Sequence, residues 1–237
     1  MNPEAVNNFA VNSDNLSIVK CSAFSSGKNG VNFEVQGKLF HLNLLGKFNV
    51  YNSLAAISAG LSQGVSLQDC KIALSKVQGV AGRMEIVAKE PFVVIVDYAH
   101  TPDSLLNVYK TLNEIKFKNQ ALKIICVLGS CGGGRDKWKR PEMGKIASKY
   151  CDEIFITNED PYDEDPLEII NQVAEGAQGR VHKILDRQEA IKKAMSVARN
   201  NDIVIITGKG SEPWMCVKNG KKIKWDDREI VRRELSH

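Results

Sequence analysis

The sequence has no apolar run that approaches the ~20 residues an α-helix needs to cross a bilayer, so we expect no membrane partner. Its six cysteines include no Cys-x-x-Cys pair, and several stand within apolar runs. This usage argues against a disulfide framework and favours a reduced, cytoplasmic protein. The net charge of +4 is low for a protein that binds duplex nucleic acid, so we expect no nucleic-acid partner.

The phosphate-binding pattern Gly-x-x-x-x-Gly-Lys-[Ser/Thr] is also absent. A different glycine-rich segment is present. Gly132–Gly134 follow the apolar run 124–128 and precede Arg135, Lys137, Lys139 and Arg140. A strand that ends in glycines and cations before a helix presents N–H groups and positive charge to an anion. The segment therefore indicates an anion site, although an ordinary turn with solvated charges is the alternative.

The first part of the chain is predicted to form a small β meander followed by helices. Apolar residues recur at helical spacing over 49–61, and Ser66 is placed to cap a second helix over 67–77. Three short strand-like segments separated by glycine-containing turns precede them. These segments are 16–24, 31–35 and 39–44.

Beyond a glycine-containing break, strand and helix patterns alternate, and we place a domain boundary near residue 88. Such alternation predicts right-handed βαβ units, a mostly parallel sheet and an α/β fold. The expected domains are 1–88 and 89–237. The predicted strands are 92–97, 124–128, 153–157 and 203–206, and the predicted helices begin at Pro102 or span 141–150, 166–177 and 187–199.

Polar residues collect where each of the four predicted strands ends. In a parallel sheet the carboxyl ends of the strands meet at one edge, where ligands bind, so a shared site is expected there. Single segments have plain alternatives: His100 can cap a helix, and the five carboxylates within 159–165 can be solvated. Their spacing does not match a calcium loop, so no metal site is expected. The four segments are 97–100, 129–136, 157–165 and 208–212.

At these positions the sequence resembles the Mur ligases, in particular the branch that adds the third residue of the peptidoglycan stem peptide. The matching segments occur in the family's order and cover most of residues 16–234. They are Gly46-Lys-Phe-Asn-Val-Tyr-Asn-Ser-Leu-Ala-Ala56, Gly82-Arg-Met-Glu85, Asp97-Tyr-Ala-His-Thr-Pro102, the loop from Gly132 to Pro141, and Gly208-Lys-Gly-Ser-Glu212.

The resemblance implies an ATP-dependent peptide ligase with ATP and Mg²⁺ as cofactors. ATP phosphorylates the carboxylate of a UDP-N-acetylmuramoyl dipeptide to an acyl phosphate, and the amine of a diamino acid attacks it. The family has a UDP-substrate domain, a central ATPase domain and a Rossmann-like C-terminal domain. Residues 1–88 resemble part of the central domain, and 89–237 resemble the C-terminal domain.

The resemblance also assigns site residues, none of them catalytic and none a metal ligand. Arg135 would bind the incoming amino acid's carboxylate, which a guanidinium fork fits. The expected ATP-binding residues are Asn49, Asn52, Arg83, Asp97, Tyr98 and His100. The expected amino-acid-binding residues are Arg135, Glu159, Asp160, Tyr162, Gly208 and Glu212.

Three departures from the family pattern qualify these expectations. The missing phosphate loop, on which Mg²⁺ binding also depends, predicts a fragment, a truncated gene or one half of a split enzyme that is inactive alone. Tyr162 replaces an arginine that holds the distal carboxylate of diaminopimelate, which favours lysine or ornithine as the substrate. Ser211 replaces a histidine next to Glu212.

Other functions remain open at this point. A folylpolyglutamate or cyanophycin synthetase would share Asp97-Tyr-Ala-His100. A non-catalytic module that binds nucleotide or amino acid, or that pairs with a separate N-terminal chain, would explain the missing phosphate loop.

Overall fold

The computed structural model describes residues 19–27, 30–117, 122–134 and 136–236. The chain divides into two compact units, Met1–Gly79 and Val80–His237. The sequence placed this boundary near residue 88. It lies earlier because strand β4 (Glu85–Ala88) pairs with β5 (Val93–Asp97) and so belongs to the second unit.

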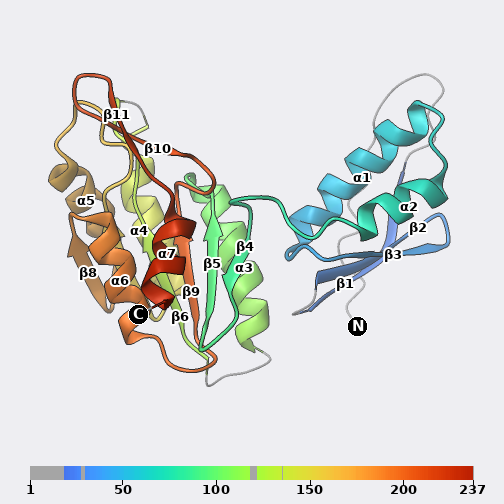
Figure 1. The fold of residues 1–237 in the computed structure, drawn as a ribbon, viewed down its shortest axis with the longest axis horizontal. Helices are drawn as coiled ribbons and strands as arrows, with labels where there is room; N and C mark the ends of the chain where they lie inside the picture. Colours follow the sequence, from blue (N-terminus) through green and yellow to red (C-terminus); the bar gives the residue numbers. More distant parts are fainter. Residues whose placement is uncertain (1–18, 28–29, 118–121, 135, 237) are drawn as a thin grey trace. The chain divides into compact units, whose positions relative to one another are not determined.

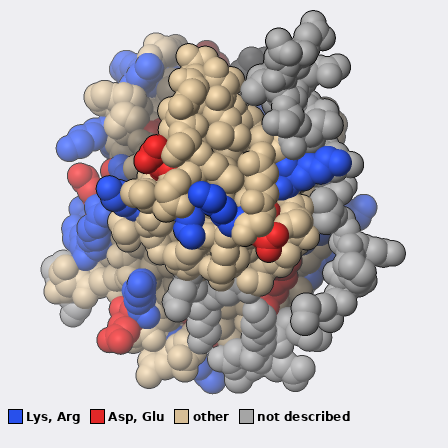
Figure 2. All heavy atoms as spheres, turned by 90° about the vertical axis from the view of Figure 1, so that its right-hand side faces the viewer, with Lys and Arg blue, Asp and Glu red and all other residues tan. Residues whose placement is uncertain are grey.

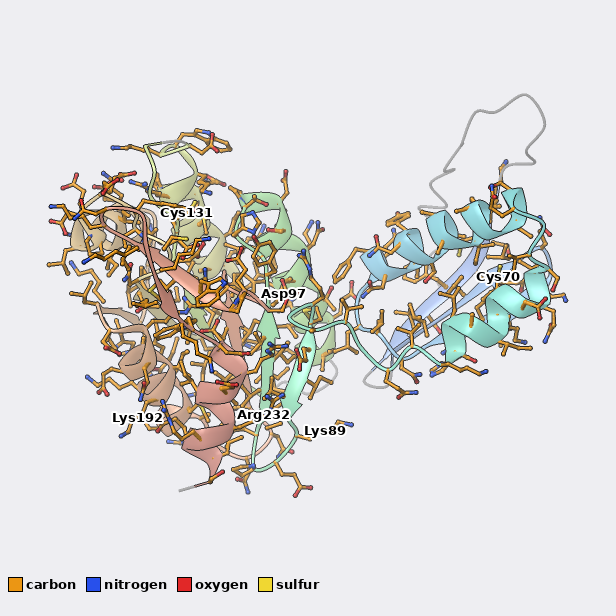
Figure 3. The ribbon with its side chains drawn as sticks, turned by 45° about the horizontal axis from the view of Figure 1, so that its top comes forward. Cys70, Lys89, Asp97, Cys131, Lys192 and Arg232 are labelled. Carbon is orange, nitrogen blue, oxygen red and sulfur yellow. The ribbon has the colours of Figure 1, made fainter. Side chains whose placement is uncertain are left out.

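The first unit is an antiparallel meander packed against two helices (Figure 1). Along β2 the side chains of Val31, Phe33 and Val35 are buried, since alternate residues of a strand share a face. They pack with apolar residues of α1 and with Cys70, which Figure 3 labels on α2. The elements are β1 (Cys21–Gly27), β2 (Gly30–Val35), β3 (Lys38–Leu42), α1 (Lys47–Ser62) and α2 (Leu67–Ser75).

The predicted elements of this unit are confirmed with small shifts. Ser66 caps α2, because its hydroxyl accepts a hydrogen bond from the backbone N–H of Asp69. The first strand was expected over 16–24, but β1 begins at Cys21 and residues 16–18 lie outside the described part. On the face drawn in Figure 2, basic and acidic side chains are scattered over a largely uncharged surface.

The second unit is built on a six-stranded sheet in the order β4-β5-β9-β6-β7-β8. Only β4, among the described strands of this sheet, runs antiparallel to its neighbour. The mostly parallel sheet predicted from the sequence is therefore confirmed. The remaining strands of the sheet are β6 (Ile124–Leu128), β7 (Glu153–Thr157), β8 (Val181–Ile184) and β9 (Ile203–Thr207).

Helices cover both faces of this sheet (Figure 1). One face carries α3, α4 and α5, and the other carries α6 and α7. The central strands β6, β7 and β9 are buried at every position, as expected for strands covered on both sides. The helices are α3 (Pro102–Phe117), α4 (Lys139–Tyr150), α5 (Pro166–Glu175), α6 (Arg187–Val197) and α7 (Asp227–Leu235).

A two-stranded hairpin, β10 (Trp214–Val217) and β11 (Lys221–Lys224), follows the last strand of the sheet. Neither this hairpin nor β4, β8 and α7 was predicted from the sequence. Within the described residues, no helix is long and apolar enough to span a bilayer.

Candidate ligand site at the carboxyl ends of the strands

The carboxyl ends of β5, β7 and β9 bring most of the expected site residues of the second unit to one edge. Figure 3 labels Asp97 and Cys131, which mark the ends of β5 and β6 at this edge. Tyr98 follows β5, Glu159 and Asp160 follow β7, and residues 208–212 follow β9. The shared edge expected from the sequence is confirmed for these segments.

Arg83, Tyr98 and His100 form an aromatic and cationic cluster beside the end of β5. The Arg83 guanidinium lies 4.6 Å from the centre of the Tyr98 ring, a cation–π distance. The His100 ring meets the same ring edge-on, with 4.6 Å between the ring centres. His100 Nδ1 bonds the Tyr98 carbonyl oxygen at 2.8 Å, which fixes the orientation of the imidazole.

Asp97 serves the backbone rather than facing the solvent. Its two carboxylate oxygens accept hydrogen bonds from the N–H groups of Met84 and Ala99, each at 2.7 Å. Burial raises the pKa of Asp97 above its usual value, although these two bonds oppose the rise. Asp97 therefore ties the segment that carries Arg83 to the end of β5.

Lys209 is buried and binds two of the carboxylate side chains that were expected to bind the substrate, Asp160 and Glu212. Its side chain is 1% exposed, and Nζ lies 2.8 and 2.9 Å from the two Asp160 oxygens. It lies 2.7 Å from Glu212 Oε2, while the Tyr98 hydroxyl donates to Glu212 Oε1 at 2.7 Å. Burial disfavours ionisation of Glu212, but these bonds outweigh it and lower its pKa. The sequence led us to expect that an ammonium group of the substrate would bind these carboxylates. The ammonium group of Lys209 already fills part of that role.

Glu159 is a carboxyl group at this edge that does not bond to Lys209. It is 4% exposed, and Oε2 has no hydrogen-bond partner among the described residues. Burial raises its pKa to about 7, with opposing effects of Arg187 and Lys209. A side chain at Gly208 would begin 2.2 Å from Oε2, and Gly208 has a φ of +109°. Glycine is required at 208 both to admit Glu159 and to adopt this backbone conformation.

The glycine loop is anchored by a buried arginine. Arg140 is fully buried and binds both carboxylate oxygens of Glu164, at 3.0 and 3.1 Å. Glu164 also accepts from the Gly134 N–H at 2.6 Å, and the Arg140 bond is the main cause that lowers its pKa to about 2. Arg140 is thus structural, whereas Lys137 is exposed and pairs with Glu164 at 3.3 Å. Arg135, which was expected to bind the substrate, lies outside the described residues.

The other acidic residues of 159–165 also have structural partners. Asp163 accepts from the Asn219 N–H at 2.8 Å, and Asp165 caps α5 through the Leu167 N–H at 2.9 Å. The Tyr162 N–H donates to the Cys216 carbonyl at 3.2 Å, and its side chain is exposed. The plain expectation of a solvated acidic loop is therefore wrong for Asp160 and Glu164, which neutralise internal cations.

A fully buried ion pair, which was not predicted from the sequence, holds the ends of β7 and β9 at this edge. Arg187 donates to both oxygens of Asp227, at 2.9 and 2.8 Å, and neither side chain is exposed. Arg187 also donates to the carbonyls of Thr207 and Asn158, the residues just before Gly208 and Glu159. A lone Arg and a lone Asp, 40 residues apart, give no local sequence pattern that would reveal the pair.

In the first unit, the two expected ATP-binding asparagines contact each other on α1. Asn49 is buried and donates to the Leu45 carbonyl at 2.8 Å, and its oxygen accepts from Asn52 Nδ2 at 3.1 Å. Asn52 is exposed. Asn49 thus has internal partners at both ends of its amide, which leaves Asn52 as the member of the pair that faces solvent.

Comparison with known proteins agrees with this architecture. The family model described as "Mur ligase, glutamate ligase domain" matches residues 82–210. UDP-N-acetylmuramoyl-L-alanyl-D-glutamate–2,6-diaminopimelate ligase of Nitrosomonas europaea is 47% identical over 205 residues, covering 81% of this chain and 39% of its own length. The enzyme of that name from Halalkalibacterium halodurans is 43% identical over 196 residues, covering 82% and 39%. The chain thus spans about 40% of the length of these curated relatives.

Solved structures extend the likeness to the fold. A UDP-N-acetylmuramoyl-L-alanyl-D-glutamate–2,6-diaminopimelate ligase superposes with a TM-score of 0.63 at 33% identity, over 94% of this chain and 46% of the other. Folylpolyglutamate synthase of Mycobacterium tuberculosis, at 20% identity and a TM-score of 0.61 over 78% and 44% of the two chains, shares the fold alone. With its matched domain, its parallel sheet and its strand-edge cluster, the chain belongs to the Mur ligase family.

Proposed function

We propose that this chain supplies the amino-acid-binding part of a ligase that extends UDP-N-acetylmuramoyl-L-alanyl-D-glutamate by one diamino acid in cytoplasmic peptidoglycan synthesis. The observation that carries the proposal is the carboxyl cluster in which Asp160 and Glu212 are both bonded to Lys209 and the buried Glu159 adjoins Asp160. Relatives 41–47% identical are named as ligases for 2,6-diaminopimelate, a diamino acid. The free thiols of all six cysteines, each in the described part, fit a reducing compartment.

The charge of the cluster supports an amine as its ligand. Lys209 neutralises one of the two charges on Asp160 and Glu212, so one negative charge remains. Glu159, whose pKa is about 7, adds a third carboxyl group that an arriving ammonium would ionise. A cation with one or two N–H donors to spare therefore gains both charge and hydrogen bonds here.

The residues of this unit divide into two proposed roles. Glu159, Asp160, Tyr162, Gly208 and Glu212 receive the amino acid and orient its amine, with Arg135 as the proposed partner of its carboxylate. Holding the amine in an attacking geometry is a large part of what a ligase contributes to rate.

A second group of residues is proposed to face the nucleotide. Arg83, Tyr98 and His100 present a cation and aromatic faces that fit a nucleotide, and Asp97 positions them. Asn52, supported by Asn49, is the proposed contact of the first unit. ATP, when bound, supplies the phosphoryl group that activates the acceptor carboxylate.

The fit to Mg²⁺ is different from the fit to ATP. No group of three His, Cys, Asp or Glu side chains that could hold a metal ion occurs among the described residues. Asp160 and Glu212 at the strand edge are already bonded to Lys209, and Asp160 also accepts from the Cys216 N–H. We therefore assign no Mg²⁺ ligand and no step through the metal to this chain.

The amino acid itself is tested by competition. Tyr162 stands where diaminopimelate-adding members carry an arginine, so we propose that lysine or ornithine binds better than meso-diaminopimelate. In isothermal titrations of the purified chain, L-lysine is expected to displace meso-diaminopimelate. Glu212→Gln should abolish L-lysine binding, and Glu175→Gln, at the end of α5, should leave it unchanged.

Two results would contradict parts of this proposal. Tighter binding of meso-diaminopimelate would overturn the preference for lysine while leaving the diamino-acid role intact. Equal lysine binding by the wild type and by Glu212→Gln would overturn the site.

The polypeptide by itself is expected to release no ADP with substrates, because its 237 residues contain no phosphate-loop pattern.

A further inference from the structure

Tyr98 contacts both proposed groups of residues, through opposite ends of one side chain. Its ring carries the Arg83 guanidinium on one side and meets the edge of the His100 ring, each at 4.6 Å between centres. Its hydroxyl donates a 2.7 Å hydrogen bond to Glu212. The two residues of that bond are 114 positions apart in the sequence and come from the ends of different strands, β5 and β9.

The bond continues into a chain of charged contacts. Glu212 binds Lys209 through its second oxygen at 2.7 Å, and Lys209 binds Asp160 after β7. Asp160 in turn accepts from the Cys216 N–H of β10 at 2.8 Å. Each partner is thus fixed by the next, and hydrogen bonds to charged groups in a partly buried setting are the strong ones.

The backbone around Tyr98 leaves the side chain little freedom to adjust alone. A side chain on Gly210 would begin 2.6 Å from Tyr98 Cβ and 2.9 Å from the Gly82 carbonyl oxygen. Gly82 in turn packs against the backbone of Gly210 and Ser211. The segment that carries Arg83, the end of β5 and the loop that carries Glu212 therefore touch at this one point, and a shift of any of them displaces the other two.

We propose that Tyr98 is a positioning residue that couples the Arg83–His100 edge to the Glu212–Lys209–Asp160 cluster, so that a nucleotide bound at the first changes the affinity for a diamino acid at the second. This coupling rests on the proposed function. A nucleotide that engages Arg83 or His100 fixes the Tyr98 ring, and the ring fixes the hydroxyl that holds Glu212. The amino acid then meets an oriented carboxylate whose ordering has already taken place, which is positive cooperativity.

The hydroxyl and the ring can be separated by substitution. Tyr98→Phe keeps the aromatic platform for Arg83 and His100 and removes only the bond to Glu212. Tyr150→Phe, at the end of α4 and outside both groups, is the matched control for loss of a hydroxyl. Neither change alters volume greatly, so both variants are expected to fold, and far-UV circular dichroism and thermal melting check this.

The experiment measures the dissociation constant of L-lysine for the purified chain with and without saturating ATP, and that of ATP with and without L-lysine. In the wild type and in Tyr150→Phe, each ligand is expected to tighten the other by the same factor, on the order of five-fold or more. In Tyr98→Phe that factor should fall to about one, and L-lysine should bind roughly ten-fold more weakly for loss of a hydrogen bond to a charged group. Affinity for ATP alone should change less than about two-fold, because the ring remains.

The outcomes separate this coupling from the proposed function. A Tyr98→Phe variant that keeps the wild-type coupling factor overturns the role of Tyr98. A wild-type chain that binds both ligands independently, or binds only one of them, overturns the coupling. A folded wild-type chain that binds neither ligand overturns the proposed function itself, and the coupling with it.

Discussion

Glu159 shows how the surroundings of a single residue at this edge disfavour its ionised form. Burial without a hydrogen-bond partner penalises the carboxylate, and the nearby Asp160 adds like charge. The cations Arg187 and Lys209 offset only part of this, so the pKa rises to about 7 from the ordinary value of 4.5. Such a group is poised to give up its proton when an ammonium arrives, which suits a binding carboxylate.

This raised pKa predicts a pH dependence of stability. The folded state holds the Glu159 proton more tightly than the unfolded state does. Protonation of Glu159 therefore stabilises the fold fully below about pH 4.5, and this stabilisation is lost as the pH rises through about 7. The wild type should lose up to about 3 kcal/mol from this source between pH 4.5 and 8. Glu159→Gln should lack that part of the decline, as urea unfolding at a series of pH values would measure.

Glu175→Gln, at the end of α5, serves as the control and should retain the wild-type decline. If Glu159→Gln and the wild type lose stability in parallel across this range, Glu159 is ionised in the folded protein and the inferred poise is wrong.

At the scale of elements, the Arg187–Asp227 pair joins parts of the fold that are distant in sequence. Arg187 opens α6, Asp227 opens α7, and the same guanidinium holds the carbonyl of Thr207 at the end of β9. The Trp225 indole N–H donates to Asp227 at 2.8 Å and completes the set. A guanidinium suits this position because its several fixed donors reach a carboxylate and two carbonyls at once.

Breaking this pair should destabilise the second unit strongly. Arg187→Met leaves a buried carboxylate without its cation and should cost about 3–5 kcal/mol in the free energy of unfolding. Arg180→Met, which removes a guanidinium that is 70% exposed and paired with Glu153, should cost about 1 kcal/mol or less. Chemical denaturation measures both. Equal effects of the two changes would show that the buried pair does not support the strand ends as described.

The elements also show which parts of the fold the sequence can predict. Strands β6 and β7 were located to the residue because short runs rich in apolar and β-branched residues signal a strand covered on both faces. Strand β11 is exposed at all four positions, three of them lysines, so its composition resembles a loop. Helix α7 depends on the cap of Asp226 and on two buried apolar residues, Ile230 and Val231, which is a short signal in a polar segment.

The sequence predicted that Asp160, Glu212 and Tyr98 lie at one edge of the sheet, but it did not predict which residues there pair with one another. The positions of Asp160, Glu212 and Tyr98 follow from the rule that ligands meet the carboxyl ends of parallel strands. The internal pairing with Lys209 does not, because it depends on how loops 49 residues apart pack against each other. The buried state of Arg140 likewise follows from a contact with Glu164 that no local pattern encodes.

For the whole molecule, the sheet order explains why segments distant in sequence meet at one edge of the sheet. Placing β9 between β5 and β6 brings the segment after β9 next to the segments after both neighbours. Residues from 82–85, 97–100 and 208–212 then meet although they span most of the second unit. Holding the proposed amino-acid residues and the proposed nucleotide residues on one sheet would let a ligase domain present an amine reproducibly.

The most direct measurement of the central claim is a map of backbone amide chemical shifts in the ¹⁵N-labelled chain as L-lysine is added. A diamino-acid site at the strand edge predicts saturable shifts at Glu159, Asp160, Gly208, Lys209 and Glu212, with their loss in Glu212→Gln. Shifts confined to other surfaces, such as the hollow between α3 and α4 that Trp138 and Lys145 line, would contradict it, as would no saturable shift at any amide.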